Sequence, residues 1–191
     1  NNKKILWHSH MPYNKIVPLR KKYCKTIVLI REPKEGIKSY AIKILRDLKI
    51  NFDNQLSYDK FLELDKKHNI ISHYNNYFIS WHKVKIKAKK YNYLNEPFIF
   101  DLDQVKKDKK TYLNFLNRFY NFEFTKDQIQ SAVEQLDISH IKKKLSKNTV
   151  RFTNTSIIFS PEIDKIIDIK CKENYEKIKK LSDEKVLLNY V

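Results

Sequence analysis

The stretch KTIVLIREPKEGIKSY, residues 25–40, joins an apolar segment to a helix-like segment through a short charged turn. Residues 26–30 are mostly β-branched and almost all apolar, which predicts a strand that is covered on both faces, as in a parallel sheet. In residues 34–48 apolar side chains recur at helical spacing. A strand that passes through a short turn into a helix is the repeating unit of α/β proteins, so this stretch predicts the fold class.

The rest of the chain repeats this alternation of strand and helix. Residues 4–8 and 97–101 predict two further strands. Helices are predicted over 57–67, 70–91, around 113–120, over 126–137, and from Pro161 onward, with Ser57, Thr125 and Ser160 as N-caps. We find no repeat and no linker, so we expect one domain over residues 1–191.

The composition limits the classes of protein to consider. The chain has 191 residues, 41% of them hydrophobic, which argues against disorder despite a net charge of +17. No apolar run approaches the roughly 20 residues of a membrane span. Residues 1–50 hold 13 Lys or Arg against 3 Asp or Glu. Such a positive field attracts an anion, which leaves nucleotide, nucleic acid, acidic glycan and lipid headgroup as candidate partners.

The charged turn in residues 25–40 is a candidate anion site. The chain has one glycine, which excludes the glycine-rich loops that hold phosphate in many nucleotide-binding proteins. An anion site built by this chain must therefore use side chains and a helix N-terminus. Arg31 follows the strand, at the end where ligands bind in open α/β sheets, and Ser39 offers a hydroxyl from the helix. The alternative is an ordinary surface corner in which Arg31 pairs with Glu32 or Glu35.

Several residue types carry weaker signals. Cys24 and Cys171 do not have the spacing of metal ligands, so we expect buried free thiols, with a single disulfide as the alternative. His73 and His82 lack a carboxylate at metal-binding spacing, so no metal site is predicted. Trp81 belongs to an apolar stripe on the predicted helix 70–91, where packing is the usual role. The sequence does not fix the compartment, although the cytoplasm is favoured.

The segment IREPKEGIKSY, residues 30–40, resembles the 3′-phosphate-binding motif of the sulfotransferase family. In that motif a strand ends in Arg, a turn of the NPxDxxxS type follows, and Ser comes eight positions after the Arg. Arg31 and Ser39 have this spacing and Pro33 matches, whereas Glu35 stands where the family usually has Asp. The resemblance implies that Arg31 and Ser39 hold the 3′-phosphate of 3′-phosphoadenosine 5′-phosphosulfate.

Other segments resemble the family in the same order along the chain. HSHMPYNKIVP, residues 8–18, is similar to the family's KTHLP segment, which implies that His10 is the general base and puts His8 at the preceding lysine. FISWHKVK, residues 78–85, resembles the family's Trp-containing helix. FIFDLDQVKKD, residues 98–108, resembles its strand and helix start, and residues 113–144 follow its order of helices. The resemblance covers about residues 7–170.

Two family motifs are missing or altered in this sequence. The loop of the PKSGTTW type, which holds the 5′-phosphosulfate, does not occur in residues 1–191. The sequence begins at Asn1 rather than Met, so we expect the loop to precede Asn1; an inactive relative that has lost the loop is the alternative. The late RKGxxG motif is not intact either. Arg151, which follows several lysines, is the candidate for its phosphate contact.

The resemblance implies a three-layer α/β fold of the P-loop NTPase type, with a central parallel sheet flanked by helices and its N-terminal part missing. It implies an enzyme that moves a sulfuryl group to a hydroxyl or amine and releases adenosine 3′,5′-bisphosphate, without a metal. His10 would act as base, His8 would stabilise charge, and Trp81 would be core or a wall of the adenine pocket. The basic surface favours a carbohydrate acceptor.

The rival hypothesis from another class of protein is a basic nucleic-acid-binding module. The net charge and the interleaving of lysine with aromatic residues, as in KKYNYL at 89–94, favour it. However, the aromatic residues follow helical core spacing and no nucleic-acid motif occurs. We therefore expect a sulfate acceptor rather than a nucleic acid as partner, and the sequence leaves the oligomeric state open.

Overall fold

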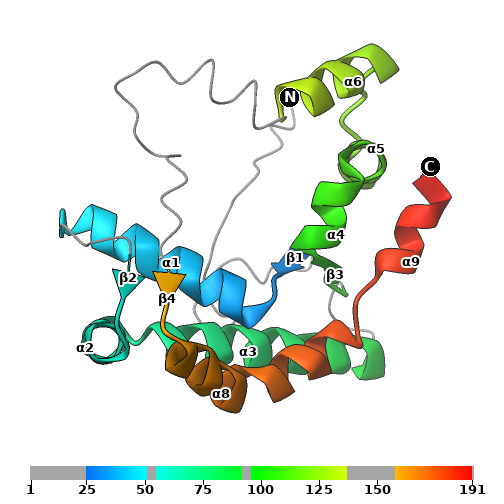
Figure 1. The fold of residues 1–191 in the computed structure, drawn as a ribbon. Helices are drawn as coiled ribbons and strands as arrows, with labels where there is room; N and C mark the ends of the chain where they lie inside the picture. Colours follow the sequence, from blue (N-terminus) through cyan, green and yellow to red (C-terminus); the bar gives the residue numbers. More distant parts are fainter. Residues whose placement is uncertain (1–24, 51–54, 92–95, 137–157, 191) are drawn as a thin grey trace.

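The computed structural model describes residues 25–50, 55–91, 96–136 and 158–190, and this part of the chain is mostly helical (Figure 1). The strands are β1 (Ile27–Ile30), β2 (Gln55–Leu56), β3 (Phe98–Asp101) and β4 (Ile158–Phe159). The helices are α1 (Pro33–Asp47), α2 (Tyr58–His68), α3 (Ile70–Tyr91), α4 (Leu102–Lys107), α5 (Lys109–Tyr120), α6 (Lys126–Gln135), α8 (Pro161–Lys179), α9 (Glu184–Leu187) and the 3-10 helix η4 (Leu188–Tyr190). No helix among these is long and apolar enough to cross a membrane.

Both small sheets in the described residues are parallel. β1 pairs with β3 so that Ile27 lies opposite Phe98 and Ile30 lies opposite Asp101, and β2 pairs with β4 in a second, shorter ladder. These pairs confirm the strands predicted at 26–30 and 97–101 and the α/β class. The larger central sheet stays a prediction, and its predicted strand at 4–8 lies outside the described residues.

Helices cover both faces of the β1–β3 ladder. Val28, Ile30 and Ile99 pack against aromatic side chains of α3 and α8 on one face. On the other face Phe100 packs against Phe115 of α5, with side chains of α9 and η4 beside it. The cover is complete on the face of Val28 and Ile30 and partial on the other, where Leu29 is 37% exposed. The three-layer architecture itself stays a prediction.

The helix ends follow the local capping signals in most cases. Ser57 accepts a hydrogen bond from the backbone N–H of Lys60 at 3.4 Å, and Thr125 forms a reciprocal capping box with Gln128. Ser160 has the extended backbone of an N-cap but makes no side-chain capping bond. Pro161 occupies the first helical position, where it has no N–H that needs a partner. Its fixed φ suits a helix and sets the start of α8.

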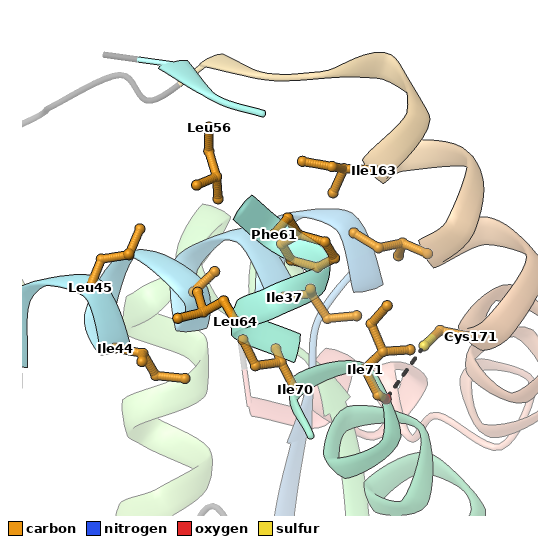
Figure 2. Close-up of a cluster of buried hydrophobic side chains, with 12 residues drawn as sticks. Ile37, Ile44, Leu45, Leu56, Phe61, Leu64, Ile70, Ile71, Ile163 and Cys171 are labelled. Carbon is orange, nitrogen blue, oxygen red and sulfur yellow. Dashed lines mark hydrogen bonds between the residues drawn. The ribbon is translucent and has the colours of Figure 1, made fainter. Parts of the chain in front are cut away.

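The largest buried cluster joins α1, α2, α3 and α8 (Figure 2). Helix α8 packs along α3, and both of these helices contact α1 (Figure 1). Cys171 of α8 is a buried free thiol whose Sγ lies 3.9 Å from the carbonyl oxygen of Ile71, the dashed contact in Figure 2. Burial raises the pKa of Cys171 to about 12. The predicted free thiol is thus confirmed at Cys171, and Cys24 lies outside the described residues.

A buried lysine joins the end of α3 to β3 and to the C-terminal segment. The side chain of Lys85 is 1% exposed, and its Nζ donates to the carbonyl of Pro97 at 2.8 Å and pairs with Asp183 at 2.8 Å and with Glu96. Asp183 also accepts from the backbone N–H of Ile99 at 2.7 Å and donates its own N–H to the Ile99 carbonyl at 2.8 Å. The ammonium group therefore fixes both the start of β3 and the residue that lies against it.

We expect Lys85→Met to destabilise the fold although methionine suits the helix and the apolar surroundings. Without Lys85, the carboxylate of Asp183 stays mostly buried with no ammonium partner. Breaking a fully buried pair costs about 3–5 kcal/mol, and the loss here should be somewhat smaller because Asp183 is 15% exposed. Urea unfolding followed by circular dichroism measures the loss. Lys87→Met, at an exposed position of the same helix, is the matched control and should change stability by less than about 0.5 kcal/mol. Equal midpoints for the two variants would contradict this account.

Candidate functional site

Two charged residues stand at the carboxyl edge of the β1–β3 ladder. Arg31 follows the last residue of β1, and Asp101 is the last residue of β3, opposite Ile30. The carboxyl ends of parallel strands meet at one edge, which is where ligands bind in open α/β sheets. The structure therefore places Arg31 at the kind of edge that the sequence predicted for it.

The guanidinium group of Arg31 keeps hydrogen-bonding capacity for a ligand. Its Nη2 lies 3.6 Å from Oε2 of Glu35, one turn along α1, and the two side chains are 25% and 62% exposed. A pair this long and this exposed contributes little free energy. The Nε atom is buried and has no hydrogen-bond partner among the described residues. Because a buried donor without an acceptor is costly, an anion that reaches Nε would gain a favourable bond.

The N-terminus of α1 is partly occupied by the protein itself. Glu32 is the N-cap, and its carboxylate accepts a hydrogen bond from the backbone N–H of Glu35 at 3.0 Å. Pro33 at the first position has no N–H to donate. The expectation that this helix end helps to bind an anion is thus weakened, because an acidic side chain already takes one of its N–H groups. Anion recognition at this corner depends mainly on side chains.

Ser39 lies exposed on α1, two turns after the strand ends. Residues four apart in a helix lie on the same side, so Glu35 and Ser39 face the same way, and Arg31 reaches Glu35 from the turn. Of the predicted pair, Arg31 and Ser39 are therefore both on the surface of one side of this corner. That they share a ligand stays a prediction.

Asp101 supports the edge rather than offering a free carboxylate. It is 6% exposed, and its Oδ1 accepts from the backbone N–H of Asp103 at 2.8 Å, which caps α4. Its Oδ2 accepts from the hydroxyl of Tyr175 at 3.0 Å. Burial, and then this hydrogen bond, raise the pKa of Tyr175. The carboxylate thus ties the end of β3 to α8 and to the start of α4.

Trp81 is 5% exposed and belongs to the cluster under the β1–β3 ladder. Its ring packs edge-on against Tyr77, with the centroids 6.4 Å apart. Of the two roles that the sequence left open, core packing describes this position. Contact between Trp81 and an adenine ring stays a prediction.

The other predicted residues, His8, His10 and Arg151, lie outside the described residues. Their predicted roles as base, charge stabiliser and phosphate contact are therefore untested by the fold. Within the described ranges, no three His, Cys, Asp or Glu side chains gather in a group that could hold a metal ion.

Two tyrosines of α3 contact the β1–α1 corner, the turn between these elements that contains Arg31. The hydroxyl of Tyr77 donates to the carbonyl oxygen of Leu29 in β1 at 3.1 Å. One turn earlier the hydroxyl of Tyr74 lies over Gly36 of α1, only 1.7 Å from where a Cβ at that position would stand. Burial raises the pKa of Tyr74 to about 12, although the positive charge of Arg31 acts in the opposite direction. Tyr77 and Tyr74 therefore both contact the β1–α1 corner.

The sequence did not reveal these tyrosine contacts. The one available signal was the position of the only glycine inside a helix, where glycine costs stability. A glycine at such a place indicates close approach by another group. It does not identify Tyr74, which is 38 positions away in the sequence.

Comparison with known proteins gives one match that covers most of the chain. A family model described as "Sulfotransferase domain" matches residues 1–177, which include the β1–α1 corner, β3 and nearly all of α8. No curated protein and no solved structure matches the chain significantly.

We expect Gly36→Ala to destabilise the protein, against the order of helix propensities. Alanine is better than glycine inside a helix by about 1 kcal/mol. Here, however, its Cβ would stand 1.7 Å from Tyr74 Oη and 2.2 Å from Cζ, so the ring must move out of its packed position. Overpacking of this kind costs about 1–3 kcal/mol. Chemical denaturation should therefore show a net loss.

The same substitution in a Tyr74→Leu background separates the two effects. The shorter side chain leaves room for the new Cβ, so the loss caused by Gly36→Ala should shrink or reverse there. If Gly36→Ala stabilises both backgrounds equally, the contact between Tyr74 and Gly36 is not what requires glycine.

Proposed function

The chain belongs to the sulfotransferase domain family and is a sulfotransferase, and we propose that it takes the sulfuryl group from 3′-phosphoadenosine 5′-phosphosulfate, with Arg31 and Ser39 holding the 3′-phosphate of this donor. The observation that carries the proposal is the position of Arg31 and its unused hydrogen-bonding capacity. It stands at the carboxyl edge of a parallel ladder, with a buried Nε that lacks an acceptor and a weak, exposed ion pair to Glu35. A guanidinium group with unused donors at this edge supports phosphate binding through side chains.

The side chains at the corner suit an anion with several oxygen atoms, such as a phosphate dianion. A guanidinium group presents several N–H donors in one plane, and Ser39 adds a hydroxyl from the same side of α1. Of the nearby acidic residues, Glu35 contacts Arg31 only through a long, exposed pair, and the other two have partners elsewhere. Glu32 is engaged in capping α1, and Asp101 is engaged with Tyr175 and the start of α4.

In the proposed reaction an acceptor oxygen attacks the sulfur atom of the donor. A new S–O bond forms while the bond between sulfur and the 5′-phosphate oxygen breaks, so adenosine 3′,5′-bisphosphate leaves with the bonding electrons. His10 takes the proton of the acceptor hydroxyl. His8 stabilises the charge that moves onto the bridging oxygen, and Arg151 and Trp81 contact the nucleotide. These four roles rest on the sequence motifs alone.

The acceptor that we propose is a carbohydrate hydroxyl. The net charge of +17 supports it, because a basic protein attracts an anionic glycan over a neutral phenol. Since positive charge also attracts the donor nucleotide, this support is weaker than the support for the donor.

Titration calorimetry of the full chain with adenosine 3′,5′-bisphosphate and with adenosine 5′-monophosphate tests the donor site. We expect the wild type to bind the bisphosphate more tightly. Arg31→Ala should weaken bisphosphate binding about 10- to 100-fold, as the loss of charge-assisted hydrogen bonds implies, and leave the monophosphate affinity unchanged. Ser39→Ala should show a smaller loss of the same kind.

Arg46→Ala provides the matched control, because it removes the same charge from the other end of α1. Its affinities should stay close to wild type for both nucleotides. If the two nucleotides bind equally well to the wild type, or if Arg46→Ala weakens binding as much as Arg31→Ala does, Arg31 is not a 3′-phosphate site. Steeply salt-dependent binding of single-stranded DNA would then favour the nucleic-acid hypothesis.

A further inference from the structure

Two tyrosines of α3 hold the β1–α1 corner on either side of Arg31. Tyr77 bonds to the carbonyl of Leu29, two residues before the arginine, at 3.1 Å. Tyr74 covers Gly36, five residues after it, in a contact that leaves no room for a Cβ. Because the two tyrosines are three residues apart, they lie on the same face of α3 and act on the corner together.

We propose that Tyr74 and Tyr77 are positioning residues for Arg31, and that their contacts with Leu29 and Gly36 set the preference of this enzyme for a nucleotide with a 3′-phosphate. This inference rests on the proposed function, because it assigns to the two tyrosines the alignment of the group that would bind the phosphate. Neither tyrosine needs to touch the nucleotide. They act by holding the end of β1 and the start of α1, which sets the direction in which the Arg31 side chain points.

The tyrosines are themselves held firmly, as a positioning role requires. Tyr77 packs edge-on against Phe78 and against the buried Trp81, with centroids 6.1 and 6.4 Å away. Tyr74 packs edge-on against Phe78 at 5.2 Å and touches both the cluster around α1 and the cluster under β1. The buried aromatic side chains of α3 therefore affect binding, because they fix the two tyrosine rings that contact the corner.

The need for such a support follows from how little else holds the end of β1. The strand has four residues and, in the described part of the chain, one paired neighbour, β3. A donor atom must stay within about 0.5 Å of its productive position to bind a phosphate oxygen well. The hydroxyl of Tyr77 fixes a backbone carbonyl beside Arg31. Burial raises the pKa of Tyr77, so this hydroxyl remains a donor throughout the physiological pH range.

Tyr77→Phe is the sharpest test because it removes only the hydroxyl that bonds Leu29. We expect it to lower the ratio of bisphosphate to monophosphate affinity roughly three- to tenfold, the size of one hydrogen bond. The affinity for adenosine 5′-monophosphate should stay unchanged. Tyr74→Phe, which removes the hydroxyl over Gly36, should lower the same ratio.

Tyr120→Phe is a control of the same chemistry at the opposite end of β1. The hydroxyl of Tyr120 donates to the carbonyl oxygen of Lys25, just before the strand begins, at 3.4 Å. Removing it deletes a hydroxyl-to-carbonyl contact of the same kind, though a longer one, and it should leave the affinity ratio unchanged because it lies away from Arg31. Thermal midpoints of all three variants, measured alongside, show whether the ratio follows overall stability.

The outcomes separate this inference from the proposed function. If the wild type prefers the bisphosphate and Arg31→Ala abolishes the preference, the donor site stands. A Tyr77→Phe variant with the wild-type ratio then overturns the positioning role alone, as does a ratio that falls equally in Tyr120→Phe. If the wild type shows no preference for the bisphosphate, the donor site and the positioning role both fail.

Discussion

The parallel pairing of β1 with β3 is the interaction on which the rest of the structure depends. It brings Arg31, which follows Ile30, and Asp101 to one edge of the ladder, although about 70 positions separate them in the sequence. Each strand is then held from outside the ladder. Tyr77 bonds the carbonyl of Leu29 in β1, and Asp183, fixed by Lys85, bonds both backbone groups of Ile99 in β3. A ladder of four residue pairs thus gains the rigidity that a binding edge requires.

The charged side chains at this edge differ in whether the protein already uses their hydrogen-bonding groups. Arg31 is the one whose donors are available to a ligand. Two of the nearby carboxylates have structural partners: Glu32 caps α1, and Asp101 caps α4 and accepts from Tyr175. Arg31 differs, because its Nε is buried without an acceptor among the described residues and its contact with Glu35 is long. An anion at this corner would therefore complete a hydrogen-bonding set that the protein leaves incomplete.

Local patterns were enough to predict the elements, and they were not enough to predict the contacts between them. Helix α3 was predicted with the bounds it has, and Ser57 and Thr125 cap their helices, because periodicity and capping act over a few residues. Nothing local links Gly36 to Tyr74 or Lys85 to Asp183. The spacing of aromatic residues in α3 did not show whether Trp81 packs in the core or lines a pocket, since both roles follow the same spacing. For Arg31, the spacing to Ser39 predicts a shared phosphate, and this stays a prediction. The contacts of Tyr77 with Leu29 and of Tyr74 with Gly36 appear only in the tertiary structure.

A crystal structure of the full chain with adenosine 3′,5′-bisphosphate is the measurement that tests the central claim most directly. We expect the 3′-phosphate at the carboxyl end of β1, with its oxygens about 3 Å from the guanidinium nitrogens of Arg31 and from Oγ of Ser39. In that complex the Tyr77 hydroxyl should still bond the Leu29 carbonyl. A nucleotide bound elsewhere, or one whose 3′-phosphate faces solvent while Arg31 stays with Glu35, would contradict the account.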